Sequence, residues 1–444
     1  MMSGASGGGA NQADAVKVRV GTFLFMAIFL FFWISIDPFV DLTGEAVLDP
    51  SAGNSNRLNQ IISLLLFAGM LGYGLAHPMR DTILHPRPLL AILFSWFLFV
   101  SLISAHPTLG IKGVILAVMV TVNASVYLLL PASERHFAKM LGIGTLIMLG
   151  VAYYGIVFKP TLAIHQASEL REPMNAGLWR GHFPHKNSAA SAMVLAAFFG
   201  LFVMNTWSRV AGLAIFVLSF LFLVKTGGKT STAMLPAILI VAWLFEKMRP
   251  LRAPIAIGGV GLFNLFAVGS AVFRPLGEFI SGLGIDATFT NRADIWRFAF
   301  SALAERPLTG YGFRAFWQTE ELVYSGGSVE TWAVAAANGH NSFLDIALTT
   351  GLPGLLLTLT WLIFLPLRDI SRIPADREQA PLTRLFVRIW LYTIFHAGLE
   401  TLFFEGGSLI WFTFVFALYG LNLQSTAVLA EDAVPTKRKR VAHA

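Results

Sequence analysis

The chain contains no cysteine in its 444 residues and few charged residues, and both absences limit what it can be. Without cysteine it has no disulfide bond, no thiolate nucleophile and no cysteine ligand for a metal. Only 13% of its residues are charged and 55% are hydrophobic, whereas an average soluble domain carries about 25% charged residues. These proportions exclude an ordinary soluble protein and indicate a polytopic membrane protein.

Apolar stretches long enough to cross roughly 30 Å of hydrocarbon recur along the chain. They predict an all-α fold of about twelve transmembrane helices, and because twelve is even, we expect both ends of the chain on one side. The predicted spans are 20–36, 58–76, 89–105, 111–130, 140–158, 187–205, 210–224, 233–246, 253–272, 342–365, 385–402 and 409–427.

The polar segments complete the predicted organisation. Residues 1–19 are expected to form a disordered tail, 20–427 the transmembrane domain and 428–444 a second, basic tail. The longest polar interruption, 273–341, is expected to be a large outer loop that carries amphipathic helices. Its clearest helix should begin at a cap on Thr290 or Asn291. The expected apolar face of that helix is Ile295, Trp296, Phe298 and Leu303.

The net charge of +7 is explained by membrane orientation, since no soluble basic domain is present to bind nucleic acid. More than half of the 32 Lys and Arg residues fall in segments on the side of the N-terminus, which predicts cytoplasmic tails. Most of the remaining cations concentrate in the outer loops 159–186, 225–232 and 273–341. An anionic ligand on the outer side is the natural reason for cations that oppose the orientation bias.

One histidine stands directly before the tenth apolar run. His340 lies at the expected water-facing mouth of that helix, and Asn341 and Asp345 are four residues apart on one helix face. A lone imidazole with no second histidine or carboxylate at metal-ligand spacing favours a general base over a metal ligand. The alternative is a histidine that only forms hydrogen bonds at the membrane interface.

Two outer segments could bind phosphate oxygens. Arg292 and Trp296 share one helix face, which suits either a guanidinium clamp or an interfacial arginine beside a tryptophan of the membrane belt. Arg180, His185 and Lys186 lie directly before the sixth apolar run, where a phosphorylated ligand would meet the headgroup region. A basic surface loop is the alternative for this second segment.

A third segment, Lys225-Thr226-Gly227-Gly228-Lys229-Thr230, superficially suggests a nucleotide P-loop. The first glycine of that motif would fall on Leu223, so the P-loop is excluded, although Lys229 could still bind an anion. The eleventh span also has ionisable residues inside it or at its mouth, which suit either a cavity or a structural Arg–Glu pair. They are Arg388, His396, Glu400 and Glu405.

At these residues the sequence resembles the O-antigen ligase and Wzy-type polymerase superfamily of bacterial envelope glycosyltransferases. The resemblance extends over nearly the whole chain, and the His185-Lys186-Asn187 form of the first matching stretch is closer to the exopolysaccharide polymerase branch. The matching stretches, in family order, are 179–187, 228–230, 291–296, 307–312 and 340–351.

The resemblance implies a GT-C-like membrane enzyme in the bacterial inner membrane, with its active site facing the periplasm. It implies an inverting glycosyl transfer that needs neither metal nor cofactor, from a glycan on undecaprenyl diphosphate. The acceptor would be a second lipid-linked glycan in a polymerase or lipid A core in a ligase. Envelope polysaccharide assembly proteins are the expected protein partners.

The same resemblance assigns roles to individual residues. The family histidine falls on His340 and one family arginine on Arg292. The position of the other family arginine holds Lys229, which keeps the charge but loses the bidentate geometry of a guanidinium. Arg180 and Lys186 are expected to join them around the donor diphosphate. The expected supporting residues are Asn341, Asp345, Trp296 and His185.

Two other classes of protein fit parts of the pattern. A transporter or flippase of lipid-linked sugars would also need a cationic cavity, but it predicts broken helices and repeat symmetry near the bilayer midplane. A scaffold protein of an envelope assembly would need none of the outer Arg and His residues.

Overall fold

The computed structural model describes residues 6–43, 57–170, 172–283, 292–319, 322 and 332–426. Within these ranges the chain is helical, and the only strand-like pairing there is an isolated bridge between Ile164 and Trp179. Ten of the described helices are long and apolar enough to cross a membrane. The predicted all-α polytopic fold is confirmed, while the exact number of spans stays a prediction.

Each of the twelve predicted apolar runs coincides with a helix. Two of these helices, α3 and α16, have only 16 residues each. The main helices are α1 (Ser6–Ile34), α2 (Arg57–Ala76), α3 (Arg87–Leu102), α4 (Pro107–Tyr127), α5 (Glu134–Phe158), α6 (Pro160–Ala163), α7 (Lys186–Thr206), α8 (Arg209–Thr226), α9 (Lys229–Lys247), α10 (Val260–Val272), α11 (Arg274–Gly282), α12 (Arg292–Glu305), α14 (Ser342–Leu359), α15 (Leu365–Arg372), α16 (Pro381–His396) and α17 (Leu409–Thr426).

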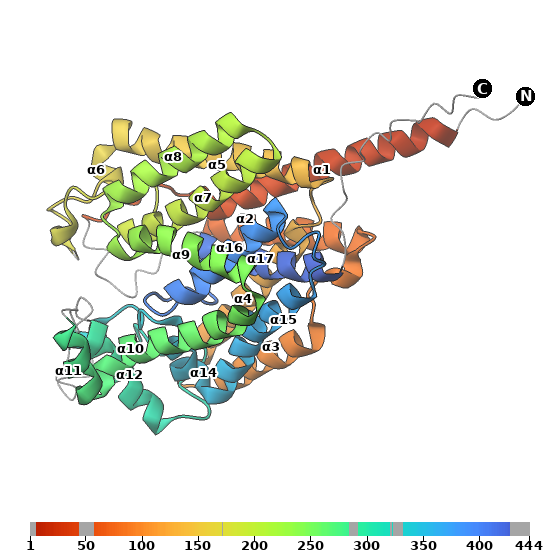
Figure 1. Cartoon of the computed structure of the whole chain (residues 1–444). Coiled ribbons are helices and arrows are strands. Elements are labelled where there is room, and N and C mark those ends of the chain that lie inside the picture. The colour runs from red at the N-terminus through yellow and green to blue at the C-terminus, as the bar shows by residue number, and fades with distance from the viewer. Residues whose placement is uncertain are drawn as a thin grey trace, which may run out of the picture.

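Two groups of helices flank a central pair. Helices α5 to α9 lie on one side and α10, α11, α12 and α14 on the other, with α16 and α17 between them (Figure 1). Helix α16 packs against α7, α9, α10 and α17, so it connects both groups. The short helices α6, α11 and α12 lie at one end of the molecule, whereas the N-terminal part of α1 projects from the other end (Figure 1). The expectation of a disordered tail over residues 1–19 is wrong for residues 6–19, which belong to α1. The expected basic tail, 428–444, lies outside the described residues.

Helix α12, which we expected to lie on or dip into the membrane interface, packs into the helix bundle. It packs against α10 and α14, and both Ile295 and Trp296 on its apolar face are buried. Its expected cap at Thr290 or Asn291 lies outside the described residues. The apolar face was therefore predicted correctly, but it contacts protein.

Helix α14 is interrupted at Gly351, whose φ is 70° and ψ 176°. Such a break frees main-chain groups that hydrocarbon cannot satisfy. Segment 307–312 supplies the partners, because two of its N–H groups donate to the carbonyls of Leu348 and Thr349 at 3.1 and 2.9 Å. Its first carbonyl accepts the N–H of Leu352 at 2.8 Å. The turn and the glycine that stood out in the sequence therefore form one main-chain joint.

Replacing Gly351 by alanine should destabilise this joint. A Cβ atom there would lie 2.0 Å from the carbonyl oxygen of Leu308, and the positive φ disfavours any side chain. We expect Gly351→Ala to cost roughly 2 kcal/mol or more and to lower the thermal unfolding midpoint in detergent. Gly150→Ala is the matched control, since a Cβ on that helical glycine meets nothing within 4 Å. Equal midpoints for both variants would contradict the joint.

Candidate active site

The loop before α14 holds His340 in a conformation that few side chains adopt. Its φ is 46°, in the left-handed region that is uncommon for residues other than glycine. Trp296 Nε1 donates to the carbonyl of Gly339 at 2.9 Å, and the N–H of Gly339 donates to Asp345 Oδ1 at 3.0 Å. The N–H of His340 donates to Asn338 Oδ1 at 3.0 Å. These contacts fix the backbone that carries the imidazole.

Asn341 caps α14 and connects it to two other elements. Its Oδ1 accepts the N–H of Leu344 at 2.9 Å. Its Nδ2 donates to Asn264 Oδ1 at 2.8 Å and to the carbonyl of Gly398 at 2.9 Å. Its side chain is completely buried. Asn341 therefore supports the site by holding α10, α14 and the segment after α16 together.

Glu400 connects the histidine, the arginine and the start of α7. Its Oε2 lies 3.2 Å from His340 Nδ1. Its Oε1 accepts hydrogen bonds from Arg292 Nη2 at 2.7 Å and from Asn187 Nδ2 at 3.3 Å. Arg292 Nη1 also donates to the carbonyl of Leu399 at 2.5 Å. One carboxylate thus joins four segments that are far apart in the sequence.

The charge on Glu400 determines which nitrogen of His340 is protonated. Burial raises the pKa of Glu400, but the hydrogen bond with His340 and the positive charge of Arg292 outweigh burial and hold that pKa at about 2. A carboxylate only accepts hydrogen bonds, so Nδ1 of His340 carries a proton, and in the neutral imidazole Nε2 then keeps its lone pair. The histidine side chain is 32% exposed. Within the described part of the chain no group bonds to Nε2, so it can accept a proton from a ligand.

Two lysines extend the positive charge beside this carboxylate. Lys186 begins α7 and lies within electrostatic range of both Glu400 and Lys229. Lys229 begins α9 and is exposed. The two helices approach closely because Gly228 has no side chain: a Cβ there would lie 2.6 Å from Ala190 Cβ. The structure therefore gathers Arg292, Lys186 and Lys229 around one region.

Arg180 is not part of this group. Its side chain is buried, with 1% exposure. Its Nη1 donates to the carbonyl of Phe183 at 3.2 Å and its Nη2 to the carbonyl of Val40 at 2.6 Å. The guanidinium of Arg180 therefore donates hydrogen bonds to main-chain carbonyls and lies buried away from the group around Glu400.

His185 holds the start of α7. Its Nδ1 accepts the N–H of Asn187 at 3.2 Å, and its Nε2 lies 2.9 Å from Glu172 Oε2. The hydrogen bond with His185 lowers the pKa of Glu172 to about 2. The N–H of Lys186 in turn donates to His165 Nε2 at 3.2 Å. His185 therefore orients the residues that follow it in the chain, Lys186 and Asn187.

The sequence placed Glu400 inside the eleventh span and gave it no role in the site. That boundary is wrong, because α16 ends at His396 and Glu400 lies in the loop beyond it. Its partners Arg292 and His340 are 108 and 60 residues away, so local spacing could not reveal them. The sequence feature that could have identified Glu400 is an acidic residue at the end of a predicted helix on the outer side, where three loops carry an excess of cations.

Comparison with known proteins identifies a family that part of the chain resembles. Residues 192–359 match the model of a family described as O-antigen ligase. That stretch contains Lys229, Arg292 and His340, whereas Glu400 lies beyond it. The resemblance of the chain to the O-antigen ligase and polymerase superfamily is therefore confirmed.

Several curated proteins share this superfamily resemblance. The exopolysaccharide production protein ExoQ of Rhizobium meliloti (strain 1021) is 25% identical over 257 residues, which cover 52% of this chain and 58% of ExoQ. A candidate polysaccharide ligase of Rickettsia bellii (strain RML369-C) is 28% identical over 158 residues, 34% of this chain and 38% of that protein. A similar protein of Rickettsia felis (strain ATCC VR-1525 / URRWXCal2) is 23% identical over 221 residues, 44% and 53% of the two chains. The chain thus spans about half the length of the curated relatives it matches.

The lowered pKa of Glu400 predicts how stability depends on pH. Because the folded-state pKa of about 2 lies below the ordinary 4.5, the carboxylate contributes stability that is complete above pH 4.5 and lost as pH falls toward 2. We expect Glu400→Gln to unfold at a lower temperature than the wild type at neutral pH, and this gap to narrow below pH 4.5. Thermal unfolding in detergent across pH measures it.

Glu278→Gln is the control, since the ion pair between Glu278 and Arg274 is exposed to solvent. It should follow the wild type at every pH. A gap between the wild type and Glu400→Gln that stays constant down to acid pH would contradict the ionised carboxylate.

Proposed function

We propose that the chain is an inverting, metal-independent membrane glycosyltransferase that polymerises an exopolysaccharide or O-antigen-like glycan. The donor is a saccharide linked to undecaprenyl diphosphate, and the reaction takes place on the periplasmic face of the inner membrane. The observation that carries the proposal is the His340–Glu400–Arg292 constellation, which combines a proton acceptor with fixed positive charge. The match of residues 192–359 to the O-antigen ligase family supports the reaction class.

In this mechanism His340 acts as the general base. The acceptor sugar hydroxyl donates its proton to Nε2 while its oxygen forms a bond to the anomeric carbon of the donor. The imidazolium that results lies against the ionised Glu400, which stabilises the new positive charge. Glu400 also holds the imidazole in the tautomer that leaves Nε2 free to accept the proton.

The cations stabilise the leaving group. As the new bond forms, the bond from the anomeric carbon to the diphosphate oxygen breaks, and its electron pair leaves with the diphosphate. Attack from the opposite side inverts the configuration at that carbon. Arg292 donates one hydrogen bond to the carbonyl of Leu399 and one to Glu400. The other N–H groups of its guanidinium remain for phosphate oxygens. Lys186 and Lys229 add charge where negative charge grows.

The identity of the acceptor separates two versions of this enzyme. A relative named for exopolysaccharide production favours a polymerase, in which the acceptor is another lipid-linked glycan. Relatives named as candidate polysaccharide ligases favour the alternative, transfer to lipid A core. Surface glycans of a deletion strain distinguish them. A polymerase defect leaves single units on the core, whereas a ligase defect leaves long chains on the lipid carrier.

A transporter of lipid-linked sugars remains the competing class, and the break in α14 is the feature that favours it. In transporters the carbonyls at such breaks bind the substrate or ions. Here the carbonyls at the break accept hydrogen bonds from segment 307–312. The transfer assay below decides between the classes, since a transporter joins no glycans.

Loss of His340 and loss of Arg292 should affect different steps. His340→Ala should lower turnover by roughly a hundred- to ten-thousandfold and leave donor binding nearly intact, because the neutral imidazole touches the hydroxyl. Arg292→Ala should weaken donor binding and turnover together, and Arg292→Lys should restore only part of both. A reconstituted assay with purified lipid-linked donor measures affinity and turnover separately.

Arg297→Ala is the matched control on α12, because that arginine is 57% exposed and lies in a pair with Asp294. It should behave as the wild type in both measurements. Equal loss of donor binding in His340→Ala and Arg292→Ala would overturn the base role and make His340 a diphosphate ligand.

The proposed orientation has its own test. With both tails in the cytoplasm, segment 273–341 lies in the periplasm, as the Lys and Arg distribution predicts. Alkaline phosphatase, which is active only in the periplasm, should be active when fused after residue 320 and inactive when fused after residue 444. An inactive fusion after residue 320 together with an active fusion after residue 444 would contradict the proposed orientation.

A further inference from the structure

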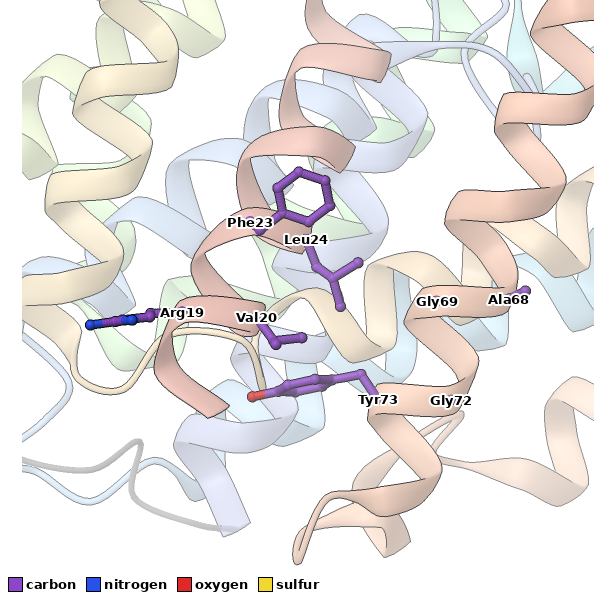
Figure 2. A pocket seen from close by; sticks show the side chains of 8 residues that line it. All are labelled: Arg19, Val20, Phe23, Leu24, Ala68, Gly69, Gly72 and Tyr73. Carbon is purple, nitrogen blue, oxygen red and sulfur yellow. The ribbon is translucent and has the colours of Figure 1, made fainter. Parts of the chain in front are cut away.

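The groove between α1 and α2 offers little to a charged ligand. Its walls are mainly apolar side chains and glycines, and the side chain of Arg19 points away from it (Figure 2). Polar groups that bear on an anionic donor gather instead around the first turn of α7.

This first turn carries a lysine where the helix dipole disfavours a cation. Helix α7 begins with Lys186 and has no acidic residue in its first turn. The N–H groups at a helix N-terminus carry partial positive charge, so they repel a cation and attract an anion. In the same turn, Asn187 Nδ2 donates to Glu400 Oε1 at 3.3 Å. The turn therefore faces the candidate active site, and its position affects both the lysine and the carboxylate.

Two histidines accept the first N–H groups of α7. His165 Nε2 accepts the N–H of Lys186 at 3.2 Å, and His185 Nδ1 accepts the N–H of Asn187 at 3.2 Å. The side chains usually found at such a position are Ser, Thr, Asp and Asn, of which aspartate would add negative charge. Neutral imidazoles satisfy the N–H groups without that charge. The positive field of the first turn is therefore left for an anionic ligand.

A carboxylate orients each of these imidazoles from its opposite nitrogen. Glu169 Oε2 lies 2.6 Å from His165 Nδ1, and this pair is buried, with side chains 1% and 4% exposed. The matching pair of Glu172 and His185 is 2.9 Å apart and much more exposed. Since Nε2 of His165 accepts an N–H, the proton of the neutral ring is on Nδ1, facing Glu169. A buried pair adds little stability over apolar residues of similar volume, so its main contribution is the orientation of the imidazole.

The main chain of His165 is fixed as well. Its N–H donates to the carbonyl of Leu178 at 2.9 Å, and its carbonyl accepts the N–H of Gly177 at 2.9 Å. The N–H of Trp179 then donates to the carbonyl of Lys225, near the end of α8, at 3.1 Å. The loop that carries His165 is thus attached both to itself and to α8. His165 is therefore a fixed point for the start of α7.

We propose that His165, oriented by Glu169, is a positioning residue for the donor diphosphate. It takes no part in bond making. It holds the main chain of Lys186, so that the ammonium group of that lysine and the hydrogen bond from Asn187 to Glu400 both face the site. This inference rests on the proposed function, which supplies the diphosphate.

Removing the buried pair tests whether His165 holds α7. In the variant His165→Phe/Glu169→Leu both partners become apolar, so no unpaired charge stays in the interior. Hydrogen exchange of the full-length protein in detergent, without added lipid, should be faster in peptides that cover Lys186 and Asn187. His165→Gln should keep the slow exchange, since glutamine also carries one acceptor and an N–H donor. Unchanged exchange in the paired variant would overturn the proposal.

Binding of undecaprenyl diphosphate tests whether that hold serves the donor. The variant His165→Phe/Glu169→Leu should weaken binding roughly threefold to tenfold, the effect of one lost hydrogen bond. His165→Gln should bind as the wild type. When Lys186→Met is already present, the paired substitution should change affinity by less than about twofold, because it acts through that lysine. A full loss in the Lys186→Met background would overturn the proposal, as would faster exchange with unchanged affinity.

His77→Phe is the matched control, because His77 Nδ1 also accepts a main-chain N–H, that of Met79 at 3.1 Å, in the loop after α2. It should change neither the exchange of α7 nor the binding of undecaprenyl diphosphate. A wild type that does not bind this lipid would contradict the proposed function and remove the positioning role with it. Failure of the positioning role alone appears only in the variants, with wild-type binding intact.

Discussion

The site depends on a single ionised carboxylate at the edge of a membrane bundle. A charge in this position is costly to desolvate unless it is paired, and Glu400 is paired with Arg292 and in contact with His340. The guanidinium of Arg292 belongs to α12, the imidazole of His340 to the loop before α14, and the carboxylate of Glu400 to the loop after α16. Their mutual attraction therefore holds these elements in register, and it also sets the tautomer of the imidazole. Removing any one partner leaves the others uncompensated.

Main-chain constraints position the histidine against this carboxylate. Gly339 has both its N–H and its carbonyl bound, by Asp345 and Trp296, so the left-handed conformation of His340 is held from two sides. Deeper in α14, the joint at Gly351 connects the same helix to segment 307–312 through backbone groups. Both the hydrogen bonds of Gly339 and the joint at Gly351 are made by main-chain groups, so they restrict the position of α14. The position of His340 relative to Glu400 is restricted as a result.

Sequence patterns predicted the features of this protein that depend on residues close together in the chain. Apolar runs of spanning length located the helices, and the polar stretch before α14 and the cations of α12, α7 and α9 located the candidate residues. The sequence could not distinguish Arg292, which contacts Glu400, from Arg180, which is buried on carbonyls, because both are arginines in outer basic segments. Glu400 was missed for a related reason: an isolated glutamate acquires its role only from partners more than fifty residues away.

The central claim is that His340 and Glu400 act as one unit, and a double-mutant cycle on the transfer rate tests it most directly. The rates compared are those of the wild type, His340→Ala, Glu400→Gln and the double variant. If Glu400 acts through the imidazole, its substitution slows the wild type but adds nothing once His340 is gone, as expected of residues in one catalytic unit. Rate losses that multiply in the double variant would show two independent roles and contradict the account.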